Sequence, residues 1–413
     1  MDDVEKIYLD DLDKPVRNAV EEEAYRSGAP VEMTPDEVLA AAVERTGLAD
    51  FGPNDFHERL AVWMQAADED TGLAISGRQQ VWDQAVLYAA NRLQLEDLIR
   101  RQPEILDIKI DRPIMIAGLP RSGTTHLVNM LAADPRLRSS QLWEMCFPFP
   151  LPGEKPGPIE QSPRFEMTKE MWKNNNVVLP HMAAIHEMHP DHVHENIEFQ
   201  GMDFSSYQLE WRARVPRWSH YYFAHDQTPH YAYEKKMMQA LTWMRGPNRW
   251  LTKAPPNMEN LIPLHTVFPD ATIVITHRDP VAVIRSSLTL LAYWDRIRRD
   301  EQDLPGLARH WLWRIEMMLK ACVRDHDALP QHQVVDVIFP RYMADQEGVV
   351  EAIYKAASLD LIPEARDRIK AYIAANRRGR HGAVQYDLSK FGVTVEEIHE
   401  RFAFYYEKFQ VRE

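Results

Sequence analysis

Residues 113–125 limit the folds open to this chain more than any other segment. The apolar run Ile114-Met115-Ile116-Ala117 ends in Gly118, and a second glycine, Gly123, follows in the next loop. Such a run is typical of a strand that is buried on both faces of a parallel sheet. Apolar residues then recur at helical spacing from Thr124 to Ala132. The segment therefore predicts a strand, a glycine loop and a helix.

A loop in this setting can bind an anion, because backbone N–H groups and the helix dipole attract negative charge there. The alternative is a tight turn that binds nothing. The nucleoside-triphosphate loop has the pattern Gly-x-x-x-x-Gly-Lys-Ser/Thr. Gly118 and Gly123 have its spacing, but Thr124 stands at the lysine position and the cation is Arg121, inside the loop. This difference disfavours an ATP or GTP hydrolase.

Later segments repeat the alternation of strand and helix. Apolar runs suited to strands, each followed by helical spacing, occupy 249–254, 271–276 and 334–339. Alternation of this kind predicts an α/β fold with a P-loop-like central parallel sheet and helices on both faces. We expect residues 111–413 to form this α/β domain. A long insertion at about 147–245 would supply either an acceptor pocket and lid or a helical subdomain that packs its own aromatic residues.

The first 110 residues read as a helical N-terminal region. Thr34-Pro35-Asp36-Glu37 has a capping-box pattern, and Ser76-Gly77 begins a second amphipathic segment. No residue there indicates catalysis. An apolar helix face in this region would allow two copies of the chain to pair, so a homo-oligomer is one expectation.

Composition excludes several classes of function. A formal net charge of −14 argues against nucleic-acid binding, which needs surplus Lys and Arg. The only cysteines are Cys146 and Cys322, which disfavours a disulfide framework or a cysteine zinc site. We find no signal-peptide pattern and no run of about 18 apolar residues, so we expect a cytoplasmic protein without stable membrane insertion.

The loop resembles a known motif. Leu119-Pro120-Arg121-Ser122-Gly123-Thr124-Thr125 is similar to the 5′-phosphosulfate-binding motif of sulfotransferases that use 3′-phosphoadenosine 5′-phosphosulfate (PAPS), in their bacterial Pro-Arg-Ser-Gly-Thr-Thr branch. The similarity extends through 131–135 and Trp143-Glu144. It implies PAPS as co-substrate, no metal, and donor contacts from Arg121, Ser122, Gly123, Thr124 and Thr125.

Two further segments resemble the 3′-phosphate site of the same family. The first segment contains Arg278, followed eight residues later by Ser286. A guanidinium presents paired donors that match phosphate oxygens. His277-Arg278-Asp279 is not a kinase catalytic loop, because that loop needs Asn where Ile284 stands. The other segment, Arg377-Arg378-Gly379, resembles the family's phosphate clamp. Its alternative interpretation is a solvated helix end whose arginines complement the dipole.

Catalytic residues are expected around the loop and in the insertion. The resemblance places Lys253 near the transferred group and implies that Arg121 stabilises the leaving phosphate. A general base is needed for the acceptor hydroxyl. The resemblance implies a Glu as the base in the run 186–196, which gives Glu195 here, with His194 or His192 as substitutes. The run lacks the His-Glu-x-x-His spacing of zincins, which leaves a histidine metal site or a surface cluster without function as alternatives.

The acceptor is less constrained than the donor. Aromatic residues follow the histidine run and would line an apolar pocket for a small or lipid-like hydroxyl compound, or simply pack in the core; they are Trp211, Trp218, Tyr221, Tyr222, Phe223 and Tyr231. The sequence predicts a PAPS-dependent sulfotransferase. The alternatives are a nucleotide-dependent small-molecule kinase with a degenerate loop and a non-catalytic anion-binding protein.

Overall fold

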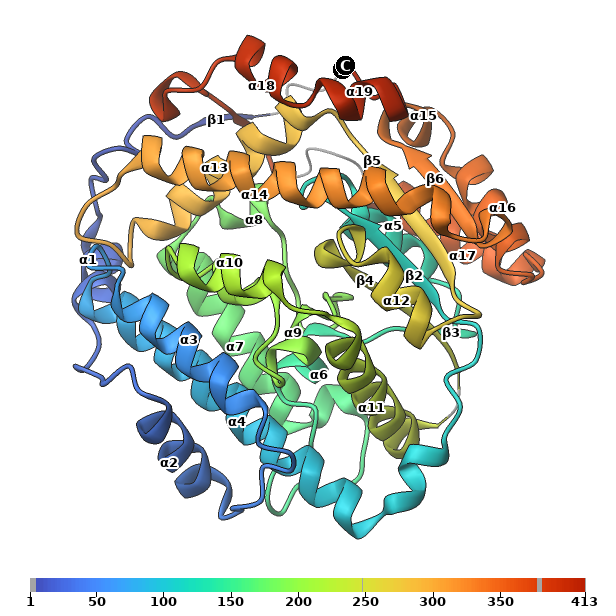
Figure 1. Cartoon of the computed structure of the whole chain (residues 1–413), viewed down its shortest axis with the longest axis horizontal. Helices are drawn as coiled ribbons and strands as arrows, with labels where there is room; N and C mark the ends of the chain where they lie inside the picture. The colour runs from blue at the N-terminus through green and yellow to red at the C-terminus, as the bar shows by residue number, and fades with distance from the viewer. Residues whose placement is uncertain (1–4, 247, 377–380, 413) are drawn as a thin grey trace.

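The computed structural model describes residues 5–246, 248–376 and 381–412, and its central sheet has the strand order β3-β4-β2-β5-β6 (Figure 1). All four pairings in this sheet are parallel. The strands are β2 (Ile114–Gly118), β3 (Leu137–Arg138), β4 (Arg249–Ala254), β5 (Thr272–His277) and β6 (Val334–Ile338). The predicted α/β fold with a central parallel sheet is confirmed. Only β3 was not predicted, since two residues are too few for a periodic signal.

Alternate residues of β2 enter two different cores. Ile114 and Ile116 belong to a cluster with buried residues of α5 (Thr124–Leu131), α16 (Gln346–Ala356) and α17 (Pro363–Ala375). Met115 and Ala117 belong to a second cluster with residues of the helices α12 (Leu261–Val267), α13 (Pro280–Asp295) and α14 (Leu304–Asp325). Successive side chains of a strand point to opposite faces, so β2 is apolar throughout because both faces are covered.

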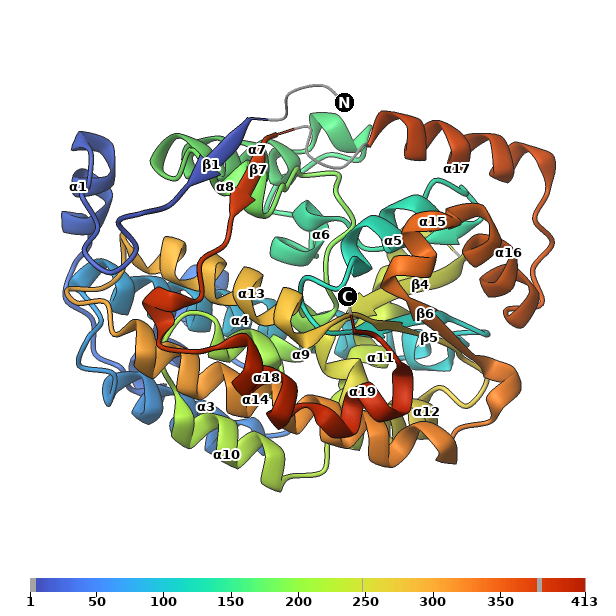
Figure 2. The same cartoon turned by 90° about the horizontal axis from the view of Figure 1, so that it is seen from above.

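The C-terminal segment adds short elements and a second sheet. Its remaining helices are α15 (Phe339–Ala344), α18 (Val395–Arg401) and α19 (Ala403–Phe409). Strand β1 (Lys6–Tyr8) pairs in parallel with β7 (Ala383–Gln385), and Figure 2 shows the two side by side. This small sheet was not predicted, because pairing between segments more than 370 residues apart leaves no local pattern.

The N-terminal region is helical, as expected, apart from β1. Its helices are α1 (Ala19–Arg26), α2 (Pro35–Thr46), α3 (Phe56–Asp68) and α4 (Ile75–Arg101). The Thr34 hydroxyl caps α2 by accepting from the Glu37 N–H at 3.4 Å. Helix α4 begins at Ile75, so Ser76 lies inside its first turn and donates to the Ile297 carbonyl at 3.0 Å. Within the described residues, no helix combines the length and hydropathy needed to cross a membrane.

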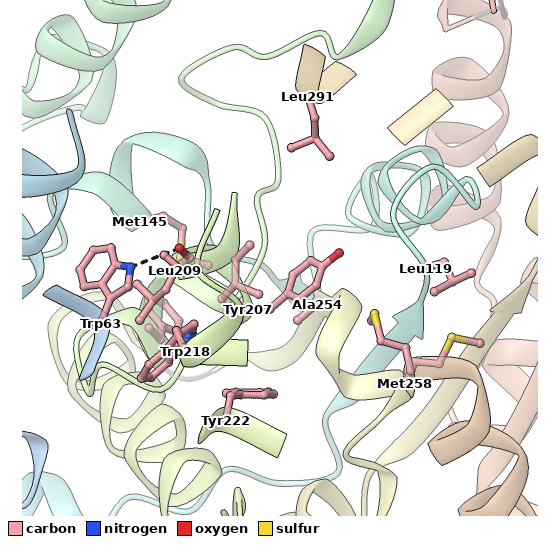
Figure 3. Packing of buried hydrophobic residues seen from close by; sticks show 14 of the residues in the cluster. Trp63, Leu119, Met145, Tyr207, Leu209, Trp218, Tyr222, Ala254, Met258 and Leu291 are labelled. Atoms are coloured by element: carbon pink, nitrogen blue, oxygen red, sulfur yellow. Dashed lines mark hydrogen bonds between the residues drawn. The ribbon is translucent and has the colours of Figure 1, made fainter. Parts of the chain in front are cut away.

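Helix α6 (Leu142–Cys146) leads into the insertion, which itself folds into helices: α7 (Pro163–Val178), α8 (Met182–Ile185), α9 (Ile197–Gly201), α10 (Pro216–Ala224) and α11 (Thr228–Arg245). It shares one core with the N-terminal helices (Figure 3). Trp63 of α3 donates its indole N–H to the Leu209 carbonyl at 3.2 Å. Arg59 and Arg92, also from the N-terminal region, both pair with the buried carboxylate of Asp203. The insertion is therefore held from the N-terminal side as well as by the sheet.

Candidate active site

The loop after β2 has a backbone that few side chains could replace. A Cβ atom on Gly118 would lie 1.9 Å from the Thr276 hydroxyl of β5, so only glycine allows this close approach. Arg121 has φ 68° and Gly123 has φ 90°, which turn the chain sharply before α5 begins at Thr124. The Ser122 hydroxyl donates to the Leu119 carbonyl at 2.6 Å. The loop therefore forms a rigid cradle at the start of a helix.

Three residues that the sequence assigned to the donor site converge on this loop. The Nε atom of Arg121 donates to Ser286 Oγ at 2.9 Å, and its Nη2 atom donates to the Ile185 carbonyl at 2.6 Å. Arg278, directly after β5, donates from Nη1 to the Arg121 carbonyl at 2.7 Å. Its guanidinium also lies 4.0 Å from the ring centre of Phe339. The predicted residues Arg377, Arg378 and Gly379 lie outside the described residues.

The carboxyl end of β4 brings Lys253 and Glu195 together beside the loop. The Nζ atom of Lys253 donates to the Thr125 hydroxyl at 3.2 Å and forms a short ion pair with Glu195 Oε1. Backbone bonds of 3.0 Å hold the residues on both sides of Glu195, from the His194 N–H to the Ser140 carbonyl and from the Asn196 N–H to the Lys253 carbonyl. A buried cation, a hydroxyl and a carboxylate are thereby fixed at one point.

The histidines near Glu195 are held in different surroundings. Burial and the nearby Lys253 lower the pKa of His192 to about 3, and its Nδ1 atom is buried without a hydrogen-bond partner. Burial also lowers the pKa of His186 well below its ordinary value, with Arg121 as the next cause. His194 Nε2 lies 3.4 Å from Glu198 Oε1. Within the described ranges, no three His, Cys, Asp or Glu side chains gather as a metal site would require.

Two pockets meet at the loop, and Arg121, Thr124 and Thr125 line both of them. One is a groove of about 750 Å³, whose walls include Arg278, Phe339, Tyr342, Lys370 and Asn376. The other is a cavity of about 210 Å³, whose apolar walls include Leu142, Phe147, Trp172, Leu290, Leu291 and Trp294. Glu195 and His194 line the cavity, whereas His192 lines a third recess next to His186 and His381.

The cavity uses other aromatic residues than the sequence suggested. Of the six aromatics named from the sequence, Trp211 lines it. Trp218, Tyr222 and Tyr231 are buried in the core instead, where the second interpretation of these residues placed them. Trp172 of α7 and Trp294 of α13 replace them in the wall. Trp172 lies in the insertion that the sequence offered as a source of the pocket, whereas Trp294 lies in the helix after β5, which no sequence pattern marked as part of the pocket.

Sequence reasoning also missed charged residues in the cavity wall. Arg212, Arg298 and Glu198 line the cavity, and the Arg298 side chain is only 2% exposed. Arg298 stands in the run Arg296-Ile297-Arg298-Arg299. Such a run ordinarily forms a solvated surface, so its burial becomes visible only in three dimensions.

The fold and the site together define a class of protein. A parallel sheet whose central strand runs into a glycine loop at the start of a helix, with a groove and an apolar cavity meeting there, is an α/β architecture that suits the binding of two ligands side by side. A family model described as "Sulfotransferase family" matches residues 113–363. The chain belongs to the sulfotransferase family.

Solved structures agree with this assignment. The sulfotransferase STF9 from Mycobacterium avium aligns with a TM-score of 0.83 and 25% identity, covering 94% of this chain and 99% of that one. The sulfotransferase STF1 from Mycobacterium tuberculosis H37Rv aligns with a TM-score of 0.79 and 26% identity, covering 90% of this chain and 98% of that one. No curated protein sequence matches significantly.

Proposed function

We propose that this protein transfers a sulfuryl group from PAPS to a hydroxyl of a small or lipid-like acceptor. The observation that carries the proposal is that Arg121, Thr124 and Thr125 line both the polar groove and the apolar cavity. A donor in the groove and an acceptor in the cavity would meet at these residues. Membership in the sulfotransferase family supports sulfotransfer over the kinase alternative.

The groove is suited to a nucleotide with two anionic ends. The loop amides, with Ser122, Gly123, Thr124 and Thr125, would hold the 5′-phosphosulfate. Arg278 and Ser286 would hold the 3′-phosphate, and the resemblance assigns Arg377, Arg378 and Gly379 to the same phosphate. A guanidinium presents paired donors to phosphate oxygens, and the hydroxyl adds another donor. The rings of Phe339 and Tyr342 line the same groove and offer apolar surface to the adenine ring of the nucleotide.

The reaction would proceed as an in-line displacement with a loose transition state. The bond between sulfur and the 5′-phosphate oxygen breaks as the acceptor oxygen bonds to sulfur. Adenosine 3′,5′-bisphosphate leaves with the added negative charge. That charge would be stabilised by the loop amides together with Arg121 and Lys253. Hydrogen bonds hold both side chains in place before the reaction begins.

Glu195 would take the proton of the acceptor hydroxyl. Its Oε1 atom is engaged by Lys253, and its side chain lines the apolar cavity, so Oε2 can face the acceptor. His194 also lines the cavity and is the substitute base. His192 is the weaker candidate, because it lines a different recess and burial lowers its pKa to about 3. A group with so low a pKa is a weak base, so it accepts the proton of a hydroxyl poorly.

Transfer of label from [³⁵S]PAPS tests the proposal. The full chain is incubated with a panel of phenols, sterols and long-chain alcohols in the presence of EDTA, and labelled ester is separated from PAPS. We expect sulfated product from at least one alcohol and none from the Arg121→Ala variant. In a parallel assay with Mg²⁺ and without EDTA, phosphate transfer from ATP to the same alcohols, without sulfate transfer in either assay, would establish the kinase alternative instead. Binding of the bisphosphate without turnover of any alcohol would favour the non-catalytic protein.

A further inference from the structure

The apolar cavity extends along one face of α13, away from the phosphate loop. Ser286 near the start of this helix is bonded to Arg121, while Leu290 and Trp294, at steps of four residues, line the cavity wall. A helix rises about 1.5 Å per residue, so Trp294 lies about 12 Å along the axis from Ser286. Arg298 lies three residues beyond the end of this helix at Asp295 and also lines the cavity. An acceptor that filled this space would be elongated.

The far part of this wall carries two arginines with unused donors. The Arg298 side chain is almost fully buried, and its Nη2 atom donates to Asp295 Oδ1 at 3.0 Å. Its Nε atom is buried and has no hydrogen-bond partner. The Nε atom of Arg212 is buried and unpartnered as well. A buried N–H donor without an acceptor is costly, and a guanidinium prefers an oxyanion as its acceptor, so these unused donors call for a ligand.

The acidic residues nearby are engaged by other groups and do not accept from these two Nε atoms. The Asp295 carboxylate is shared, because its Oδ2 atom accepts from Arg299 Nε at 2.9 Å. Glu198 accepts from the Tyr88 hydroxyl at 2.6 Å and lies beside His194. Burial, with the further influence of Arg212 and Arg299, lowers the pKa of Arg298 to about 10. The two Nε donors therefore remain without an acceptor at this end of the cavity.

We infer that the acceptor of this enzyme is an elongated apolar hydroxyl compound that carries an anionic group, a carboxylate or another oxyanion, at the end remote from the reacting hydroxyl. Arg298 and Arg212 bind that group, while Leu290, Leu291 and Trp294 contact the apolar body. The inference rests on the proposed function, since it takes Glu195 and the loop to mark the reacting end. It narrows the acceptor from lipid-like alcohols in general to amphipathic anions.

A matched pair of probes tests the inference. Binding of ω-hydroxylaurate and of its methyl ester is measured by calorimetry on the full chain, with and without adenosine 3′,5′-bisphosphate. We expect the acid to bind about tenfold or more tightly than the ester, because a hydrogen bond to a charged group is worth about 1.5–3 kcal/mol. We expect Arg298→Met to weaken binding of the acid about tenfold and to leave binding of the ester unchanged. Substitution of the half-buried Arg212 by Gln should have the same two effects.

The exposed Arg285 of α13 supplies the control, since Arg285→Gln should change neither affinity. If Arg298→Met does not fold, Arg212→Gln carries the comparison alone. Equal binding of acid and ester, or binding of neither, contradicts the inference. Failure of the bisphosphate to bind would count against the donor proposal instead, while the acid and ester can still be compared in its absence.

Discussion

The Nε atom of Arg121 donates a 2.9 Å hydrogen bond to Ser286 Oγ, which ties the loop after β2 to helix α13. The next residue, Ser287, has a buried hydroxyl without a hydrogen-bond partner. The two serines therefore form a matched pair, in which one hydroxyl supports the loop and the other does not.

Ser286→Ala should weaken binding of adenosine 3′,5′-bisphosphate by about three- to tenfold, the value of one hydrogen bond in the site. Ser287→Ala should leave the dissociation constant unchanged. Isothermal titration of the bisphosphate into each variant measures both. Equal effects of the two substitutions would show that the Ser286 hydroxyl has no special part in donor binding.

Glu195→Gln should lower kcat for sulfate transfer by about 10²–10⁴, the usual contribution of a general base. The bisphosphate should bind as before, because Glu195 lines the acceptor cavity and not the groove. His192→Asn is the control and should keep most of the wild-type kcat. Retained activity in Glu195→Gln, together with loss in His192→Asn, would move the base to the histidine.

The sequence predicted the parts of the fold that rest on local pattern. The strand–loop–helix unit at β2 and the strands β4, β5 and β6 were all predicted, because each is a short run with apolar residues that is followed by helical spacing. The pairing of β1 with β7 could not be predicted, since it depends on residues far apart in the chain. Helix α4 was predicted to start at Ser76 and begins one residue earlier, at Ile75.

The residues of the candidate site likewise divide into those that the sequence could predict and those that it could not. Arg121 and Arg278 follow strands of one parallel sheet, so their convergence follows from topology. The ion pair between Glu195 and Lys253 depends on the path of the insertion, which has no clear periodicity. The cavity arginines Arg212 and Arg298 lie in segments that look like ordinary polar surface. Only packing shows that both line a cavity.

Glu234 should make stability depend on pH. Its buried carboxyl accepts from Asn196 Nδ2 at 2.7 Å and Gln200 Nε2 at 2.9 Å, and burial raises its pKa to about 7. The folded state thus binds a proton more tightly than the unfolded state. This contribution to stability is full below about pH 4.5 and is lost as pH rises to about 7, by about 3 kcal/mol.

Urea unfolding at about pH 5 and pH 7 measures this difference. Glu234→Gln should reduce it, because glutamine does not titrate, whereas the exposed Glu104→Gln should not. An unchanged pH dependence in Glu234→Gln would show that Glu234 does not titrate in this range. Because Asn196 adjoins Glu195, a loss of kcat in Glu234→Gln without weaker bisphosphate binding would further indicate that Glu234 helps to position the base.

Arg314 of α14 should be essential for stability. Its fully buried guanidinium pairs with Glu210 at 2.7 Å and Glu259 at 2.6 Å. Arg314→Met would leave two buried carboxylates without their cation and should cost about 3–5 kcal/mol of unfolding free energy. Arg217→Met, which breaks an exposed pair with Glu69, should leave the unfolding free energy nearly unchanged. Similar values for the two variants in urea unfolding would contradict this account.

The most direct test of the donor site compares how tightly two nucleotides bind to it. Calorimetry on the full chain measures the dissociation constant of each. We predict that adenosine 3′,5′-bisphosphate binds, that ATP with Mg²⁺ binds far more weakly, and that Arg278→Met removes the preference, because Arg278 is assigned to the 3′-phosphate and lines the groove. Tighter binding of ATP than of the bisphosphate, or a preference that survives Arg278→Met, would contradict the account.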